Sequence, residues 1–300
     1  MSAQGNADHL SPTLWWILAG LTLAWGFNWT AMKVALSEVA PFTFRSMCLG
    51  AGSAVLFVVM KASGHALAVP KGQRLRLLML ALVSVTGWNV LVAFGLTMIP
   101  SGRAAILAYT MPAWAIPLSV WVLGERLTGK KLLGFALGMA GIVLLLTERI
   151  VDLQGAPFGS LLVLCAAVTW ALSTVLIKRF PVAMPAGPYT AWIMLLGGAP
   201  IFVGALILDD FGALTGVSAA AWGGVAYNVL IAFAFAHWAW IKLTTSLSVT
   251  AFSLSMLLTP SLGVFSGMMF LGEEPTLVEY SALALVLGSL LVVMLPGRRL

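Results

Sequence analysis

The sequence predicts an all-α membrane protein in which ten transmembrane helices form two inverted five-helix repeats. Three observations predict this fold class: the composition, a succession of ten long apolar segments, and the recurrence of the same motifs in both halves of the chain. Of the 300 residues, 61% are hydrophobic and 9% are charged, whereas a soluble domain carries about 25% charged residues. Too few polar side chains are available to cover a water-exposed surface, so we expect the lipid bilayer to surround the protein.

Each apolar segment is close to the length of about 20 residues that a membrane-spanning helix needs. The expected spans are 13–35, 42–61, 74–98, 102–123, 131–147, 157–178, 188–208, 218–243, 248–271 and 277–295. The first five and the last five define two units, residues 13–147 and 157–295.

Basic residues are distributed unevenly between the two sides of the predicted membrane domain. Twelve of the 16 Lys and Arg residues fall on the side of the two termini, and the other four are Lys33, Arg45, Arg103 and Arg149. Because loops rich in Lys and Arg stay in the cytoplasm, this distribution predicts that both termini are cytoplasmic. No basic run lies on a soluble surface that also carries aromatic residues, so nucleic acid is not an expected partner.

Motifs of the first half recur in the second half. The stretches "WGFNWTAMK" (25–33) and "WALSTVLIK" (170–178) each place a tryptophan eight residues before a lysine. The stretches "WNVLVAF" (88–94) and "YNVLIAF" (227–233) each place an asparagine in an apolar run. Two apolar helices can look alike by chance, but these matches involve polar and aromatic residues in the same order. We therefore interpret spans one to five as repeated in spans six to ten.

The fourth and ninth spans show how the repeats are oriented. The stretch "YTMPAWAIPLSVWVLGERLT" (109–128) parallels "LLTPSLGVFSGMMFLGEEPT" (257–276) and pairs Pro112 with Pro260. Because each repeat has an odd number of spans, the second repeat enters the membrane in the opposite direction. Inverted repeats around a midplane site are the architecture of secondary transporters, since the two halves can rock between two arrangements of similar energy.

The chain resembles the drug/metabolite transporter superfamily, in the ten-helix type built from two EamA-like units. The resemblance rests on the "WGFNWTAMK" span, on the prolines of spans four and nine, and on their "LGERLT" and "LGEEPT" ends, and it covers nearly the whole chain. It implies a bacterial inner-membrane exporter of amino acids or other metabolites. The sequence is most similar to bacterial aromatic amino acid exporters, which implies a preference for aromatic substrates.

Aromatic and polar residues at membrane depth are the candidate site. The candidate substrate-binding residues are Trp25, Asn28, Asn89, Tyr109, Trp170, Ser173, Tyr227, Asn228, Trp238 and Ser253. Aromatic walls with a few polar groups are typical of small-molecule sites, and core packing is the alternative for each aromatic residue. For Asn89 and Asn228 two interpretations stay open: they face a central cavity and meet water or substrate, or they hydrogen-bond a neighbouring helix.

Titratable residues limit the mechanism. All ten Asp and Glu residues fall at span ends or in loops, so the exchange of lipophilic cations for protons is not expected, because it needs a carboxylate at membrane depth. The mid-span titratable residue is His237, for which packing is a better interpretation than proton relay. Lys33 and Arg103 lie near span ends, where they steer a substrate carboxylate or anchor the helix at the interface.

We therefore expect a secondary transporter that exports neutral amino acids, with a preference for aromatic and bulky apolar ones, by alternating access. The alternative is an exporter of other small metabolites or drugs, such as nucleosides or neutral toxins. A membrane enzyme is not expected, because the sequence lacks a mid-span carboxylate, a metal-binding cluster or a Ser/His pair at useful spacing. No motif for ATP or another cofactor is present, and the sequence leaves the oligomeric state open.

Overall fold

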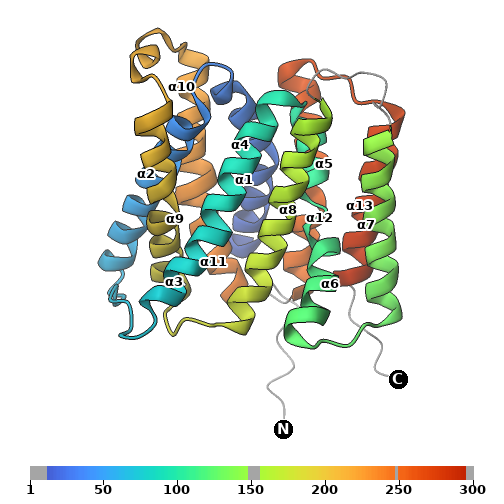
Figure 1. Ribbon diagram of the computed structural model, residues 1–300, viewed down its shortest axis with the longest axis horizontal. Helices are drawn as coiled ribbons and strands as arrows, with labels where there is room; N and C mark the ends of the chain where they lie inside the picture. The colour runs from blue at the N-terminus through green and yellow to red at the C-terminus, as the bar shows by residue number, and fades with distance from the viewer. Residues whose placement is uncertain (1–11, 148–155, 247–248, 295–300) are drawn as a thin grey trace.

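The computed structural model describes residues 12–147, 156–246 and 249–294, and in these ranges the chain forms ten helical rods (Figure 1). The rods of the first half are α1 (Pro12–Leu36), α2 (Pro41–Ala62), α3–η1–α4 (Arg74–Ala81, Leu82–Gly87, Trp88–Met98), α5–α6 (Ser101–Ala108, Met111–Leu123) and α7 (Gly129–Thr147). The rods of the second half are α8 (Ala156–Arg179), α9 (Ala186–Leu208), α10–η3–α11 (Ala219–Ala226, Tyr227–Phe235, Ala236–Ser246), α12 (Val249–Leu271) and α13 (Leu277–Met294), with a short 3₁₀ helix η2 (Phe211–Gly216) between the second and third rods.

Length, composition and exposure of the rods are those of a membrane protein. Within the described residues, six segments are long and apolar enough to cross a bilayer: Pro41–Ala62, Arg74–Met98, Ser101–Leu123, Pro157–Arg179, Ala186–Leu208 and Ala219–Trp240. Large apolar side chains on the outside stay exposed, for example Trp121 at 82% and Ile207 at 73%. Such side chains are stable against lipid and unfavourable in water. The predicted fold class, a ten-helix membrane protein of two repeats, is confirmed.

The two ends of the described chain lie at one face of the molecule. Helix α1 begins and α13 ends at the lower side of Figure 1. We call this side, with the Gly124–Gly129 loop, the terminal face, and the opposite side, where α1 ends at Leu36, the distal face.

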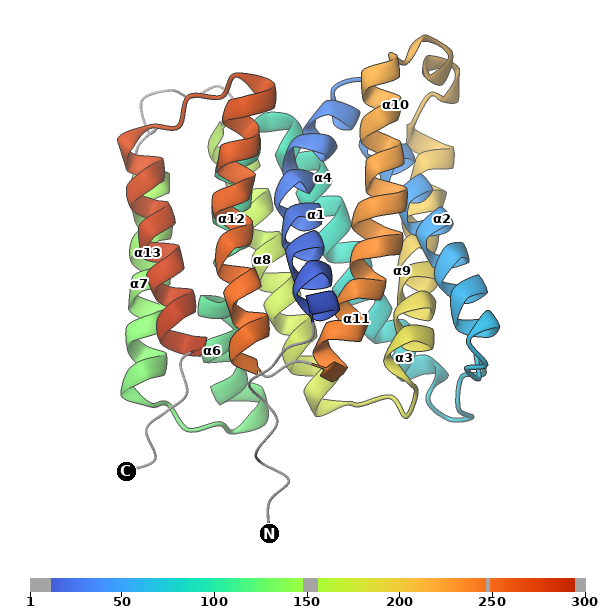
Figure 2. The ribbon, with the colours of Figure 1, turned by 180° about the vertical axis from the view of Figure 1, so that it is seen from behind.

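Helix packing follows an inverted two-fold symmetry. Two pairs of equivalent rods pack on each other, α2 on α9 and α7 on α13. Helix α1 packs on α12 and on the rod α10–η3–α11, and its counterpart α8 packs on the rods α5–α6 and α3–η1–α4. Figures 1 and 2 show the result, with α1 and α8 central and α7 and α13 together at one edge. The central rods are therefore the ones that bring the two repeats together.

Matched glycines end the fourth and ninth rods. Gly124 and Gly272 adopt left-handed φ angles of 68° and 64°, which residues with a β-carbon rarely adopt. After each glycine the amide of a glutamate turns back onto its own helix: Glu125 donates to the Ser119 carbonyl (3.3 Å) and Glu273 to the Gly267 carbonyl (3.2 Å). The repeated Leu-Gly-Glu sequence thus builds the same helix end at opposite faces.

Regular helix is interrupted in the interior of three rods. The segments η1 and η3 are π-helical; η1 ends directly before the first Asn motif, and η3 contains the second. Such π-helical turns occur frequently at functional sites. The fourth rod is broken at Tyr109 and Thr110, where α5 ends and α6 begins one residue before Pro112. Its counterpart α12 continues through Pro260, so the matched prolines do not produce matched breaks.

Candidate functional site

Two tryptophans form an aromatic contact between the repeats. The rings of Trp88, at the start of α4, and Trp170, in α8, lie with their centroids 5.0 Å apart at an interplanar angle of 59°. Trp170 remains 39% exposed, so it is only partly covered by the contact. The structure thus brings the candidate Trp170 to the segment that also carries Asn89.

The second repeat provides the corresponding contact on α1. The Tyr227 hydroxyl, at the start of η3, donates to the carbonyl of Ala24 (2.9 Å), and the indole of Trp25 donates to the carbonyl of Ala232 in η3 (3.4 Å). Trp25 is the motif counterpart of Trp170, and Tyr227 is the counterpart of Trp88. In both repeats, therefore, the aromatic residue that precedes the asparagine contacts the helix that carries the matched tryptophan of the other repeat.

The two asparagines bond to their own helices. The Asn89 side-chain amide donates to the Val85 carbonyl (2.8 Å), and that of Asn228 donates to the Gly224 carbonyl (3.0 Å). Both bonds connect residues across an end of a π-helical segment, where the regular backbone pattern changes. Within the described residues neither donor bonds to a neighbouring helix, which was one of the two interpretations of the sequence. Asn228 is fully buried, and its Oδ1 has no partner among the described residues.

Asn28 and Ser173 are counterparts in α1 and α8 with different surroundings. The Oδ1 atom of Asn28 is buried and meets no hydrogen-bond donor in the described part of the chain. Ser173 is buried, and its hydroxyl donates to the carbonyl of Trp170 (2.8 Å). An unmet acceptor at membrane depth is costly unless water or a ligand reaches it, so Asn28 is the stronger candidate for ligand contact.

The three other candidates are not joined to these contacts. Tyr109 is buried at the break between α5 and α6, beside Thr259 of α12. Trp238 packs on Phe235 of the preceding segment, with ring centroids 6.0 Å apart, and stays 38% exposed. Ser253 belongs to α12, but its side chain lies outside the described residues.

His237 packs among aromatic rings. Its ring stacks on Phe233 (5.3 Å, 18°) and meets Trp25 edge-on (6.2 Å, 80°), and its Nδ1 lies 3.1 Å from the Ala232 carbonyl. These contacts agree with packing as the role of this histidine.

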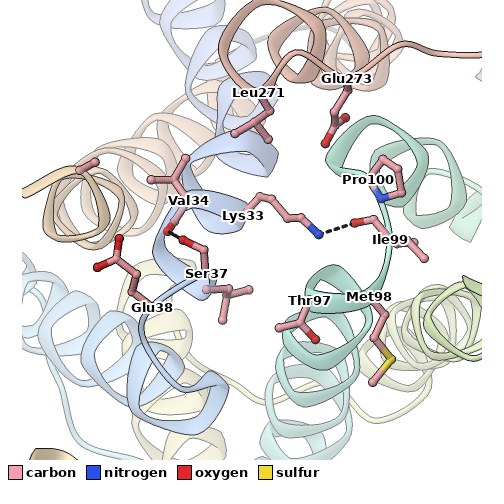
Figure 3. A pocket seen from close by; sticks show the side chains of 12 residues that line it. Lys33, Val34, Ser37, Glu38, Thr97, Met98, Ile99, Pro100, Leu271 and Glu273 are labelled. Carbon is pink, nitrogen blue, oxygen red and sulfur yellow. Dashed lines mark hydrogen bonds between the residues drawn. The ribbon is translucent and has the colours of Figure 1, made fainter. Parts of the chain in front are cut away.

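A cavity of about 670 Å³ opens at the distal face (Figure 3). It is lined by Lys33, Val34, Leu36, Ser37, Glu38, Thr97, Met98, Ile99, Pro100, Ala220, Leu271 and Glu273. The turn between α4 and α5 lies between two of its three ionic groups, Lys33 and Glu273. Lys33 donates to the carbonyls that end α4, Leu96 (2.6 Å) and Ile99 (2.7 Å). Glu273 accepts from the amides that begin α5, Ser101 (2.6 Å) and Gly102 (3.0 Å).

At the terminal face the equivalent charges meet directly. Lys178, the counterpart of Lys33, lies 3.1 Å from Glu125, the counterpart of Glu273. Glu125 also pairs with Lys131 at 2.8 Å. Hydrogen bonds from Lys131 and then from Lys178 lower the pKa of Glu125 to about 2, so this carboxylate is ionised at neutral pH.

The sequence analysis missed the partners of these charges. It placed Lys33 near a span end, but it did not connect Lys33 with Glu273 or Lys178 with Glu125. The signal was available, since both lysines end the repeated tryptophan motif and both glutamates belong to the repeated Leu-Gly-Glu motif. Spacing along the chain does not show that the two motifs meet in space.

Inverted repeats that meet along central helices, with aromatic and polar groups at membrane depth, define a secondary transporter and not an enzyme. The sequence profile of the EamA-like transporter family matches residues 12–147 and again 157–295. The chain belongs to this family.

Curated relatives share about a quarter of the sequence over most of their length. An uncharacterized transporter of Bacillus subtilis, YoaV, is 25% identical, with 92% of each chain covered. A probable amino-acid metabolite efflux pump of Escherichia coli is 24% identical, with 91% of each chain covered. The uncharacterized inner membrane transporter YedA of E. coli is 25% identical, with 93% of this chain and 89% of the relative covered. A solved crystal structure shares the fold at a TM-score of 0.66 and 20% identity, covering 95% of this chain and 97% of the other.

Proposed function

We propose that this protein exports neutral amino acids across the bacterial inner membrane, with a preference for aromatic and bulky apolar side chains. The observation that carries the proposal is the Trp88–Trp170 ring contact between the repeats, which is matched at the equivalent helix interface by the hydrogen bonds of Tyr227 and Trp25. Stacking on tryptophan and tyrosine favours flat or bulky apolar groups. The E. coli relative named as a probable amino-acid metabolite efflux pump supports this substrate class.

A zwitterion also needs polar groups of both kinds at membrane depth. The buried Oδ1 of Asn28 is an acceptor that fits the ammonium group of an amino acid. The break at Tyr109 and Thr110 leaves the first amides of α6 inside the fourth rod, where the positive end of a helix favours a carboxylate. Because Glu279, in the first turn of α13, is the only carboxylate within the described rods, a neutral zwitterion fits these surroundings better than a cation.

The proposal is tested by efflux from proteoliposomes loaded with phenylalanine, tryptophan, leucine, a nucleoside and a cationic dye. We expect phenylalanine and tryptophan to leave fastest and the dye to stay inside. Repeating the assay with and without a pH gradient shows whether protons drive transport. Efflux of the nucleoside at a higher rate than any amino acid would replace the proposal with the alternative of a general metabolite exporter.

A further inference from the structure

The two repeats carry the same lysine and glutamate at opposite faces. Lys33 and Lys178 end the tryptophan motifs of α1 and α8, and Glu273 and Glu125 follow the left-handed glycines after α12 and α6. The inverted symmetry places Lys33 with Glu273 at the distal face and Lys178 with Glu125 at the terminal face.

The two pairs differ in geometry in this structure. The Lys178 ammonium touches the Glu125 carboxylate at 3.1 Å. Lys33 and Glu273 both line the distal cavity and interact electrostatically, but no direct ion pair joins them within the described residues. Each is bonded instead to the α4–α5 turn between them. Lys33 donates to carbonyls, of which Ile99 is seen in Figure 3, and Glu273 accepts from amides.

Inverted repeats explain how such a difference arises. If the first repeat adopts the conformation of the second and the second that of the first, the protein reaches a state of similar energy that faces the other side of the membrane. Contacts made by residues that match in the two repeats are then exchanged between the two faces. We propose that Lys33 and Glu273 form a direct ion pair in this exchanged state, while Lys178 and Glu125 separate.

The contacts at both faces suit a reversible exchange. Lys178 is 69% exposed and Glu125 32% exposed, and exposed ion pairs are weak enough to open. Lys33 and Glu273 are held by charge-assisted hydrogen bonds to peptide groups, so pairing with each other exchanges one set of charge-assisted bonds for another. The lysine and the glutamate act as positioning residues of the transport cycle. The proposal goes beyond the substrate assignment, because it holds for any transported molecule.

The test uses electron paramagnetic resonance to measure the distance between two spin labels on the protein in proteoliposomes. Distal labels replace Ser37 and Glu274, and in a second preparation terminal labels replace Arg126 and Arg179. All four side chains are exposed and lie near the proposed pairs without belonging to them. Cys48 is fully buried, so only Cys165→Ala is needed to avoid labelling of native cysteines.

Two charge swaps shift the equilibrium between the present state and the exchanged state in opposite directions. The distal swap, Lys33→Glu with Glu273→Lys, keeps the proposed ion pair but turns each charge against the peptide groups that it now contacts. The terminal swap, Glu125→Lys with Lys178→Glu and Lys131→Gln, keeps the pair seen in this structure. In the distance distribution of the distal labels, we expect the distal swap to raise the ratio of the population with the short distance to the population with the long distance at least about fivefold. The terminal swap should lower this ratio by a similar factor.

The terminal labels provide the reciprocal readout, since the distal swap lengthens their distance. A distal swap that leaves the distal distance unchanged or longer overturns the proposal, because peptide contacts alone then explain the two residues. Size-exclusion chromatography shows whether each variant is folded. If the distal swap does not fold, the terminal swap decides: a lower fraction of the short distal distance supports the proposal, and an unchanged fraction refutes it.

Discussion

Asn89 and Asn228 make the same hydrogen bond in the two repeats, each to the carbonyl four residues earlier in its own helix. The partners are Val85 at 2.8 Å and Gly224 at 3.0 Å. A side-chain amide has two donors and an acceptor, so this bond uses only part of its capacity. For Asn228 the remaining acceptor is buried without a described partner. The repeated asparagine is therefore suited to meet a further group from the transported molecule or from water.

We predict that Asn228→Leu lowers transport by about tenfold, or ~1.4 kcal/mol, because the substrate loses a polar contact. The melting temperature should change by less than about 3 °C, since the lost intrahelical bond is offset by the removal of an unmet acceptor. Transport in proteoliposomes and thermal unfolding of the purified protein measure the two effects.

Asn89→Leu is the matched variant in the first repeat, and we expect the same combination of effects. If both variants keep full transport and melt several degrees lower, the asparagines only stabilise their helices. The substrate cavity then lies elsewhere.

Trp170→Ala should lower transport more than Trp222→Ala at equal expression. The two side chains are equally exposed, at 39% and 40%, so they are well matched. Trp170 packs against Trp88 of the other repeat in a tilted ring contact, and such aromatic pairs contribute about 0.5–1.5 kcal/mol beyond the buried area. Trp222 lies in α10 near the distal face. Initial rates of phenylalanine efflux measure the difference, and equal losses would reject the aromatic contact as part of the site.

The fold could be predicted from the sequence because the membrane imposes simple rules. Apolar length identifies each span, and the repeated Trp, Asn, Pro and Leu-Gly-Glu positions show the internal symmetry. The helix ends at Gly124 and Gly272 follow from the same pattern.

The bonding of the site was much harder to predict. Nothing in the sequence distinguishes a π-helical turn from an α-helical one, so the partners of Asn89 and Asn228 were not foreseen. The sequence pairs Pro112 with Pro260, but only the rod that contains Tyr109 is broken. The contacts of Lys33 depend on where the α4–α5 turn lies relative to α1, which is a property of tertiary packing.

The loop between α2 and α3 should face the cytoplasm, because most basic residues lie on the terminal face. Gly72 in this loop has a φ of 83°, which a cysteine adopts only with strain. Lys71→Cys, in the neighbouring exposed position, is therefore the better reporter, and Thr215→Cys reports on the distal face. An impermeant maleimide added to intact cells should label Thr215→Cys alone. Labelling of Lys71→Cys instead would reverse the orientation.

The stability that Glu125 contributes should depend on pH in a defined window. Hydrogen bonds from Lys131 and Lys178 lower the pKa of Glu125 from an ordinary 4.5 to about 2. Because the pKa of Glu125 is lower in the folded than in the unfolded protein, its contribution to the free energy of unfolding is complete above the pKa of the unfolded state. This contribution is lost as the pH falls from about 4.5 towards about 2. Its size is about 0.2–1 kcal/mol, because Lys178 is mostly exposed and solvent screens the pair.

Glu125→Gln should therefore melt slightly below the wild type at pH 7 and equally far below it at pH 5.5, and the gap should close as the pH approaches 2.5. Glu274→Gln is the control, because Glu274 is an exposed carboxylate in the matched loop of the second repeat and should show no such gap. Thermal unfolding in detergent at the three pH values measures both variants. A gap that disappears already between pH 7 and 5.5 would mean that the ion pair with Lys131 and Lys178 does not hold Glu125 in its charged form.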